Sequence, residues 1–187
     1  MTVIEPTPGE RAVARRAAES RATVPHLELS VAAPGEVSTA RLVRACALAL
    51  SKHPRANAAY RDGRFELYSR VNVGVVLAGG DSYLIPTVFD AERKPVAELE
   101  QEIAGLVESA RGGGLASPAF SGATFTVWNA GAMALAAASI PTVPPQAAAL
   151  AAGTQSLTLS SDHRILYGAV ATGFLKAIAH HLDGDGV

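Results

Sequence analysis

The sequence lacks the features that mark disulfide-stabilised and nucleic-acid-binding proteins. Its 187 residues include one cysteine, so no disulfide can form within the chain. Sixteen lysines and arginines stand against seventeen aspartates and glutamates, a formal net charge of -1. Proteins that bind nucleic acids or anionic membrane surfaces carry an excess of positive charge, which is missing here. We therefore expect no nucleic-acid or membrane-surface partner.

Long apolar runs and metal-ligand clusters are also missing. Glycine, proline or charged residues interrupt each apolar run before it reaches membrane-spanning length, and residues 1–6 lack the basic start and apolar stretch of a signal peptide. His180 and His181 are adjacent near the end of a predicted helix and suggest no metal site. We predict a soluble, metal-free protein in the reducing cytoplasm, with Cys46 as a buried, inert thiol.

The composition fits one domain. Hydrophobic residues make up 49% of the chain and charged residues 18%, which suits one core with some surface buried against other subunits. Neither an internal repeat nor a linker divides the chain. We therefore treat residues 1–187 as one domain that forms an oligomer.

Hydrophobic spacing predicts an alternation of helices and strands. Helices are expected over residues 9–22, 39–52, 94–111 and 169–182, the second capped by Ser38 and Thr39. Extended segments are expected over residues 26–31, 65–69, 71–78, 84–89, 123–128 and 157–161, with breaks at 79–81 and 112–118. Residues 132–153 are too rich in alanine to assign, although three prolines exclude one continuous helix. The mixed order predicts an α/β or α+β sandwich.

His163 is the leading candidate for chemistry. It lies between the strand predicted at 157–161 and the last helix, in the kind of connection where folds often hold reactive groups. Its imidazole can accept a proton from a thiol or hydroxyl and return it to a leaving thiolate, as acyl transfer requires. On the local pattern alone, a hydrogen-bonded structural histidine is the commoner case.

Several segments, taken in order, resemble the catalytic domain of the dihydrolipoamide acyltransferases of 2-oxoacid dehydrogenase complexes, relatives of chloramphenicol acetyltransferase. They are AVARRAAESRATVPHLELSV, RACALALSKHPRANAAY, VNVGVVLAGGDSYLIPTVFDAERKPVAELEQEI, FSGATFTVWNAG, PPQAAAL and LTLSSDHRILYGAVATGFLKAIAHHL. The last of these segments resembles the C-terminal part of the family's catalytic domain, which carries the signature His-Arg-x-x-Asp-Gly. Together these matches favour a catalytic role for His163.

The resemblance implies a chloramphenicol acetyltransferase-like, two-layer α/β sandwich with a mixed sheet and helices packed on one face. It also implies a homotrimer, or a larger assembly of trimers, with active sites in channels between subunits. In that family the acyl thioester and the acceptor enter the channel from opposite ends, and the resemblance implies that His163 deprotonates the attacking thiol or hydroxyl. The oxyanion that forms needs a hydrogen-bond donor, and no metal takes part.

The family pattern also assigns site residues. Besides His163, the catalytic candidates are Asn129 and Tyr167. The predicted substrate-binding residues are Trp128, Gly131, Ser161, Asp162 and Arg164. No residue is assigned to a separate cofactor site, since acyl-CoA acts as donor substrate.

Two of these positions depart from the family. The family commonly has Ser-Asn-x-Gly where this chain has Trp128 followed by Asn129, so the hydroxyl linked to oxyanion stabilisation is absent. Trp128 has three possible roles: donating its indole N–H, walling off the channel or filling the core. Tyr167 stands at the signature's acidic position and cannot pair as an anion with Arg15 or Arg16. The chain also looks short after residue 31 and after residue 155.

Three functions are consistent with these residues. The favoured one is a stand-alone acyltransferase that moves an acyl group, acetyl above all, from acyl-CoA to an alcohol or thiol, because no lipoyl or peripheral-subunit-binding domain is seen. O-acetylation of a tetronate-type natural product is the specific guess. The alternatives are the dihydrolipoamide acyltransferase core of a 2-oxoacid dehydrogenase complex and a noncatalytic trimeric scaffold.

Overall fold

The computed structural model describes residues 1–79, 82–112, 114 and 117–184. The α-helices of this part of the chain are α1 (Pro8–Thr23), α2 (Thr39–Lys52), α3 (Val96–Arg111) and α4 (Gly168–Asp183). Its strands are β1 (His26–Ala32), β2 (Ala58–Arg61), β3 (Arg64–Leu67), β4 (Val73–Val75), β5 (Leu77–Gly79), β6 (Ser82–Leu84), β7 (Thr87–Val88), β8 (Phe125–Asn129), β9 (Ala148–Ala152) and β10 (Ser156–Asp162). Short 3₁₀ helices are η1 (Ala91–Arg93), η2 (Ser117–Phe120) and η3 (Gly131–Met133).

Local sequence explains where the first two helices begin. Thr7 caps α1: its hydroxyl accepts a hydrogen bond from the backbone N–H of Glu10, whose carboxylate accepts one from the Thr7 N–H. Ser38 caps α2 by accepting a hydrogen bond from the Arg41 N–H at 3.2 Å. Because Ser38 takes the cap position, Thr39 becomes the first residue of α2.

Among the described residues, six strands form a mixed sheet in the order β1-β10-β9-β8-β4-β7. β9 runs parallel to β8, and β8 runs parallel to β4. The pairs β1–β10, β10–β9 and β4–β7 are antiparallel. A β2–β3 hairpin and a β5–β6 hairpin lie beside this sheet.

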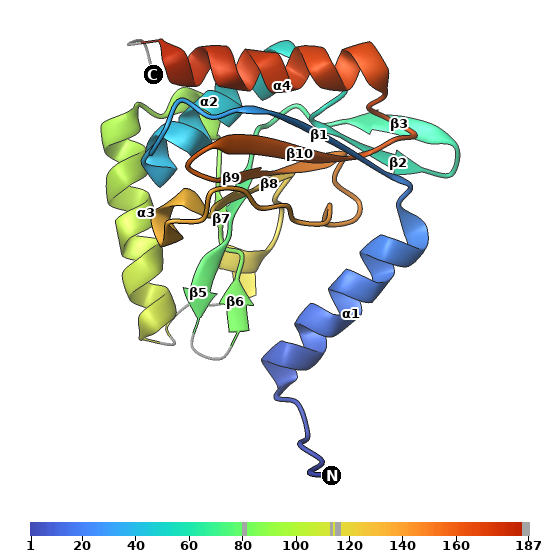
Figure 1. Ribbon diagram of the computed structural model, residues 1–187, viewed down its shortest axis with the longest axis vertical. Helices are drawn as coiled ribbons and strands as arrows, with labels where there is room; N and C mark the ends of the chain where they lie inside the picture. The colour runs from blue at the N-terminus through green and yellow to red at the C-terminus, as the bar shows by residue number, and fades with distance from the viewer. Residues whose placement is uncertain (80–81, 113, 115–116, 185–187) are drawn as a thin grey trace.

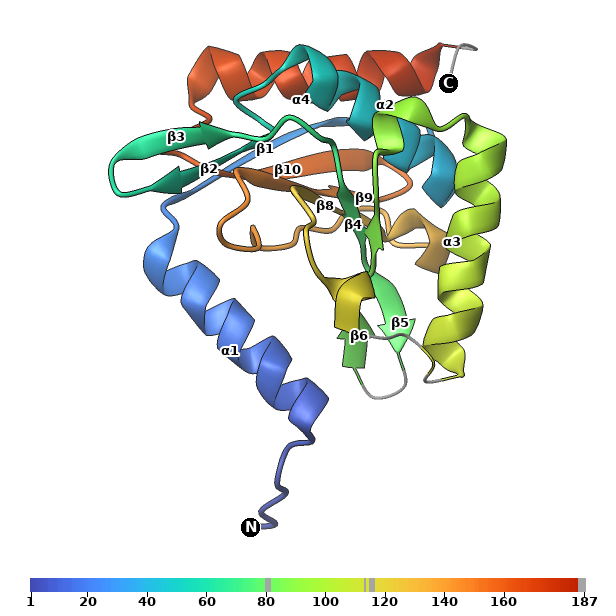
Figure 2. The same ribbon diagram turned by 180° about the vertical axis from the view of Figure 1, so that it is seen from behind.

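The sheet has one apolar face and one more polar face. Alternate residues such as Leu29 on β1 and Leu159 on β10 point to the side covered by α2, α3 and α4. On the other side, the Ser30 and Thr158 hydroxyls lie 3.0 Å apart in a hydrogen bond. α4 and α2 lie over one side of the sheet, and α1 projects away from the body on the other (Figures 1 and 2). The predicted mixed sheet with helices on one face is confirmed.

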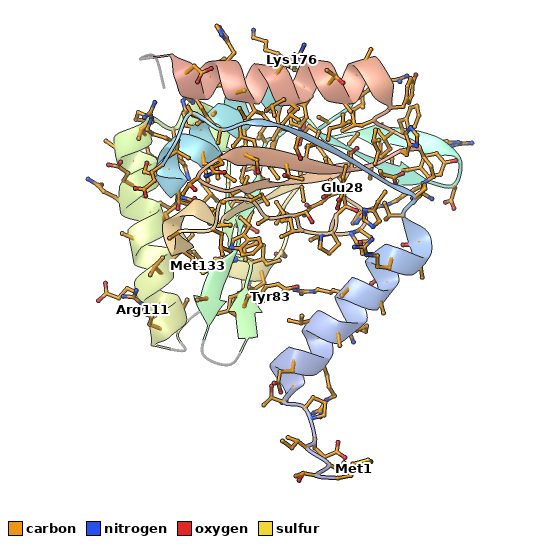
Figure 3. The ribbon with its side chains drawn as sticks, viewed as in Figure 1. Met1, Glu28, Tyr83, Arg111, Met133 and Lys176 are labelled. Atoms are coloured by element: carbon orange, nitrogen blue, oxygen red, sulfur yellow. The ribbon has the colours of Figure 1, made fainter. Side chains whose placement is uncertain are left out.

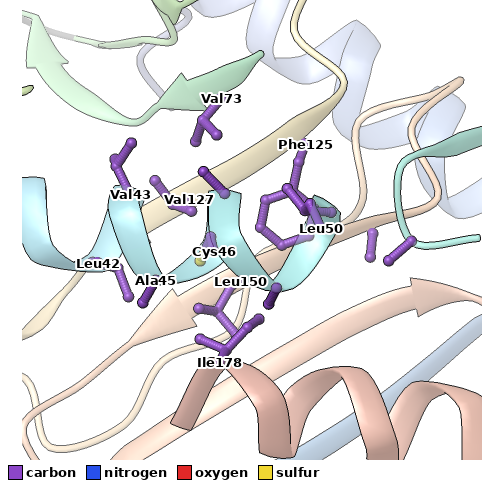
Figure 4. Packing of buried hydrophobic residues seen from close by; sticks show 14 of the residues in the cluster. Leu42, Val43, Ala45, Cys46, Leu50, Val73, Phe125, Val127, Leu150 and Ile178 are labelled. Carbon is purple, nitrogen blue, oxygen red and sulfur yellow. The ribbon is translucent and has the colours of Figure 1, made fainter. Parts of the chain in front are cut away.

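The core lies between α2, α4 and the sheet (Figure 4). The Phe125 and Phe174 rings meet edge to face with their centroids 5.8 Å apart, and both side chains are fully buried. Cys46 is also buried, as the sequence predicted, and burial raises the pKa of its thiol well above the ordinary value.

The four predicted helices are confirmed with small shifts of their ends. The strand predicted over 71–78 is divided into β4 and β5, the segment predicted over 84–89 contains the end of β6 and the short β7, and β2 was not predicted. The segment left unassigned, 132–153, begins in η3, turns at a cis bond between Pro144 and Pro145, and ends in β9. Parts of the predicted breaks, residues 80–81, 113 and 115–116, lie outside the described residues. Among the helices described, none is both long and apolar enough to cross a bilayer.

Replacing Phe174 by alanine tests the core. The change removes a fully buried ring that packs on Phe125, and we expect the free energy of unfolding to fall by about 3–5 kcal/mol. Urea denaturation followed by circular dichroism measures this change. Lys176→Ala is the matched control, since Lys176 is exposed on the same helix (Figure 3) and its loss should cost less than about 0.5 kcal/mol. Equal losses in the two variants would contradict this account of the core.

Candidate active site

Asp162 organises the connection between β10 and α4. Its carboxylate is buried and accepts hydrogen bonds from the Arg164 backbone N–H at 2.9 Å and from the Arg164 Nη2 at 2.7 Å. Its backbone carbonyl accepts from the N–H groups of Ile165 and Leu166. The Arg164 guanidinium also lies over the Tyr60 ring, 4.5 Å from its centroid, and hydrogen bonding to Asp162 raises the pKa of Arg164. These contacts fix the turn that holds His163.

His163 is exposed on this turn. Its backbone N–H donates to the Pro25 carbonyl at 2.9 Å, which ties the turn to the residue that precedes β1. The imidazole is therefore carried on a fixed backbone and is open to the outside of the protomer. A base in this position can be reached by groups that lie outside its own subunit.

Tyr167 contacts a cation that the sequence did not single out. The Arg55 Nη1 donates to the Tyr167 hydroxyl at 3.0 Å. The Arg55 guanidinium also lies over the Tyr167 ring and the Phe65 ring, 5.9 and 5.0 Å from their centroids. Arg55 belongs to the connection between α2 and β2. At position 167, therefore, a tyrosine pairs with Arg55. The family pattern implies an acidic residue at this position, paired with an arginine of the first helix.

Asn129 ends β8 with its carboxamide engaged inside the protomer. The Nδ2 group donates to the Val37 carbonyl at 2.9 Å and to the Thr39 hydroxyl at 3.1 Å. The Oδ1 atom accepts from the Ala132 N–H at 3.3 Å. A carboxamide has two N–H donors, so both are used by these bonds. Asn129 therefore joins the end of β8 to the start of α2.

A cavity of about 710 Å³ lies next to this strand end. Trp128, Tyr83 and Met133 contribute apolar surface to it, and Arg16 and Thr39 also line it. Tyr83 lies on β6 between the sheet and α1 (Figure 3). The half-buried Trp128 thus faces an open space and not the apolar core, so the core-filling role is wrong.

The turn that holds His163 and the strand end that holds Trp128 and Asn129 lie at opposite ends of the sheet. In the β10–β9 pair, Ser161 is opposite Ala148, and in the β8–β9 pair, Asn129 is opposite Ala152. Four residues of a strand separate these positions, which is about 13 Å at the rise of a β-strand. A single protomer cannot bring His163 to the end of β8.

The structure uses several other predicted residues internally. Ser161 is fully buried and its hydroxyl donates to the Leu27 carbonyl at 3.2 Å, while Asp162 is occupied by Arg164. As a correction to the sequence assignment, neither side chain offers a surface to a substrate in this protomer. Gly131 begins η3, where an added Cβ would lie 3.4 Å from the Asn129 Oδ1. Among the described residues, no cluster of three metal-ligating side chains is found.

The family model of the 2-oxoacid dehydrogenases acyltransferase (catalytic domain) matches residues 37–185. The chain belongs to this family. A Rickettsia bellii relative, the dihydrolipoyllysine-residue acetyltransferase component of pyruvate dehydrogenase complex, is 28% identical over 91% of the chain. The mitochondrial dihydrolipoyllysine-residue acetyltransferase component 3 of pyruvate dehydrogenase complex from Arabidopsis thaliana is 30% identical over 76% of the chain. The chain spans 50% of the first protein and 30% of the second.

Solved structures of the family share the fold. A probable dihydrolipoamide acetyltransferase from Listeria monocytogenes superposes with a TM-score of 0.93 at 23% identity, covering 100% of this chain and 97% of the other. The cubic core of the pyruvate dehydrogenase multienzyme complex gives 0.91 at 23% identity, covering 97% and 91%. A chloramphenicol acetyltransferase gives 0.61 at 13% identity, covering 97% and 99%. The predicted chloramphenicol acetyltransferase-like fold is confirmed.

Asp162→Ala tests the role of the buried carboxylate in the turn. The variant loses the charge-assisted bonds to the half-exposed Arg164, and we expect the free energy of unfolding to fall by about 1–3 kcal/mol. Glu66→Ala is the control, because the Arg61–Glu66 pair is exposed and should contribute less than about 1 kcal/mol. Chemical denaturation of both variants measures the difference. A loss for Asp162→Ala no larger than the control's would show that the turn does not depend on this carboxylate.

Proposed function

We propose that this chain is the catalytic core of a dihydrolipoamide acetyltransferase of the 2-oxoacid dehydrogenase type, which transfers an acetyl group between coenzyme A and dihydrolipoamide. The membership of residues 37–185 in the family carries this proposal. The named relatives are dihydrolipoyllysine-residue acetyltransferases, so they favour the dihydrolipoamide function over O-acetylation of a natural product. A cytoplasmic location remains part of the proposal.

The active site in this proposal lies between two subunits of a homotrimer. The separation of about 13 Å along β9 supports it, because His163 of one protomer needs the β8 end of another to complete a site. The exposure of His163 and the cavity beside Trp128 also support it, because both can be reached from another subunit. The structural neighbour from a cubic core supports further assembly of trimers.

The proposed reaction is acetyl transfer from the thioester acetyl-CoA to a dihydrolipoamide thiol, with His163 as general base. The His163 imidazole takes the proton of a dihydrolipoamide thiol, and the thiolate attacks the carbonyl carbon of acetyl-CoA. The carbonyl π electrons move to oxygen and form a tetrahedral oxyanion. When this intermediate collapses, the bond to the coenzyme A sulfur breaks, and the departing thiolate takes the proton back from His163. The products are S-acetyldihydrolipoamide and coenzyme A, with no net redox change.

His163→Ala tests the general base. We expect kcat for transfer from acetyl-CoA to dihydrolipoamide to fall about 10²- to 10⁴-fold, because the attacking thiol loses its proton acceptor. Chromatographic measurement of coenzyme A release follows the reaction. His180→Ala is the control, since this histidine is exposed on α4 away from the turn, and it should keep the activity of the unaltered protein.

Undiminished turnover by His163→Ala would exclude the mechanism. An unaltered protein that transfers no acyl group to dihydrolipoamide, but does transfer to small alcohols, would restore the O-acetylation function. No transfer from any of a broad set of acyl thioesters would favour the noncatalytic scaffold.

Mixing subunits tests the shared site. We expect His163→Ala and Asn129→Ala each to lose most of the activity, because the first removes the general base and the second releases the end of β8 from the start of α2. In randomly mixed trimers prepared by refolding the two together, about a quarter of the interfaces join an intact His163 to an intact β8 end. Activity near a quarter of the unaltered value is therefore expected. A mixture no more active than the separate variants would place both halves in one subunit.

A further inference from the structure

The end of β8 lacks the hydroxyl that the family pattern links to oxyanion stabilisation. Residue 128 is a tryptophan with no hydroxyl, and both N–H groups of Asn129 are already donated within the protomer. Acyl transfer depends strongly on a positioned donor, whose loss reduces the rate about 10²- to 10³-fold. Another group beside the cavity has to supply this hydrogen bond if the chain is an efficient enzyme.

Thr39 places a hydroxyl at this point. It is the first residue of α2, it is half-buried, and it lines the cavity together with Trp128 and Asn129. Its Oγ1 accepts a hydrogen bond from the Asn129 Nδ2 at 3.1 Å. This bond crosses 90 residues of sequence and fixes the hydroxyl oxygen at the end of β8.

The proton of this hydroxyl is left for another acceptor. A threonine hydroxyl donates one hydrogen bond and accepts up to two. Within the described part of the chain, the Thr39 hydroxyl accepts the bond from Asn129 and donates none. Because it accepts from a carboxamide, its O–H is polarised and becomes a better donor. Asn129 thus acts on the cavity through Thr39.

We propose that the Thr39 hydroxyl is the oxyanion donor of this enzyme and replaces the hydroxyl absent at position 128. The inference rests on the proposed acetyltransferase function. As the thiolate attacks acetyl-CoA, the thioester carbonyl oxygen gains negative charge and accepts the hydrogen bond from Thr39. When the bond to the coenzyme A sulfur breaks, the carbonyl re-forms and that bond weakens. The Thr39 proton stays on Thr39 throughout.

The Trp128 indole N–H is the competing donor, because this side chain also lines the cavity. Thr39 is the stronger candidate because its oxygen is held by a hydrogen bond at the strand end, whereas no hydrogen bond of the described residues orients the indole N–H. Trp128→Phe removes the indole N–H and keeps an aromatic side chain, so it separates the two donors.

Paired substitutions at Thr39 provide the test. Thr39→Val keeps the shape and removes the hydroxyl, and we expect kcat for dihydrolipoamide acetylation to fall about 10²-fold with KM for acetyl-CoA little changed. Thr39→Ser restores the hydroxyl and should stay within roughly fivefold of the unaltered kcat. Thr39→Ala serves as a second hydroxyl deletion if the valine variant fails to fold. Trp128→Phe should keep a kcat well above that of Thr39→Val.

Ser38→Ala is the control for damage to α2. Its hydroxyl caps the helix beside Thr39 but is not part of the cavity lining, so the variant should lower the thermal midpoint and leave kcat unchanged. A kcat for Thr39→Val equal to that of the unaltered protein would overturn the assignment. A larger loss in Trp128→Phe than in Thr39→Val would also overturn it and assign the donor to the indole.

The same measurements separate this inference from the proposed function. If the unaltered protein is active and His163→Ala is not, the acetyltransferase function stands. Normal turnover by Thr39→Val then rejects only the oxyanion role of Thr39. If the unaltered protein acetylates no thiol or alcohol, the acetyltransferase function and the inference fail together. An unchanged kcat with a raised KM in Thr39→Val would assign Thr39 to ground-state binding and reject the oxyanion role.

Discussion

The direction of β10 relative to β8 determines what this protomer can do alone. β10 runs antiparallel to β9, and β9 runs parallel to β8. The chain therefore leaves β10 toward α4 at one end of the sheet and leaves β8 toward η3 at the other. Hydrogen-bonded register in a buried sheet cannot slip by even one residue without turning every side chain to the wrong face. The separation of the two candidate groups is as rigid as the core itself.

This rigidity makes oligomerisation a requirement for the proposed chemistry. A loop movement could not close a gap of about 13 Å between opposite strand ends. In the proposed homotrimer a second protomer closes it, since a heterologous interface would bring the His163 end of one copy to the β8 end of the next. The exposed His163 and the cavity beside Trp128 are then two halves of one site.

The supports around His163 also differ in their strength. Asp162 is buried and bonded to Arg164 through a fork of charge-assisted hydrogen bonds, so it holds the backbone of the turn. Tyr167 is 47% exposed, and its contact with Arg55 combines one hydrogen bond with a cation–π interaction. A contact of this kind near solvent contributes only about 0.5–1 kcal/mol. The turn therefore depends mainly on Asp162, and the loss of an acidic residue at position 167 leaves it intact.

Sequence patterns identified the elements whose signals are local. The Ser38 cap and the apolar stripe of α2 predicted that helix, and alternation predicted β10. Residues 132–147 gave no such signal, because alanine fits helix and strand alike. Their path depends on distant contacts, such as the Gln146 carboxamide oxygen that accepts a hydrogen bond from the Thr126 hydroxyl at 2.8 Å.

Residues whose roles come from long-range contacts were missed for the same reason. Arg55 meets Tyr167 across 112 residues of sequence, and no local pattern marks that pair. Thr39 was identified only as part of a helix cap. Its position beside Asn129 appears when α2 packs against the end of β8.

The bond between Asn129 and Thr39 explains how a serine could be lost at position 128 without the loss of a hydroxyl donor. Oxyanion stabilisation requires a donor at one place in space, not at one place in the sequence. Asn129 holds the end of β8 and the start of α2 together, so either element can present a hydroxyl to the same cavity. Once Thr39 supplies it, the side chain at position 128 is free to become large and apolar. Trp128 on β8 then shapes the cavity, while Thr39 on α2 donates the hydrogen bond to the oxyanion.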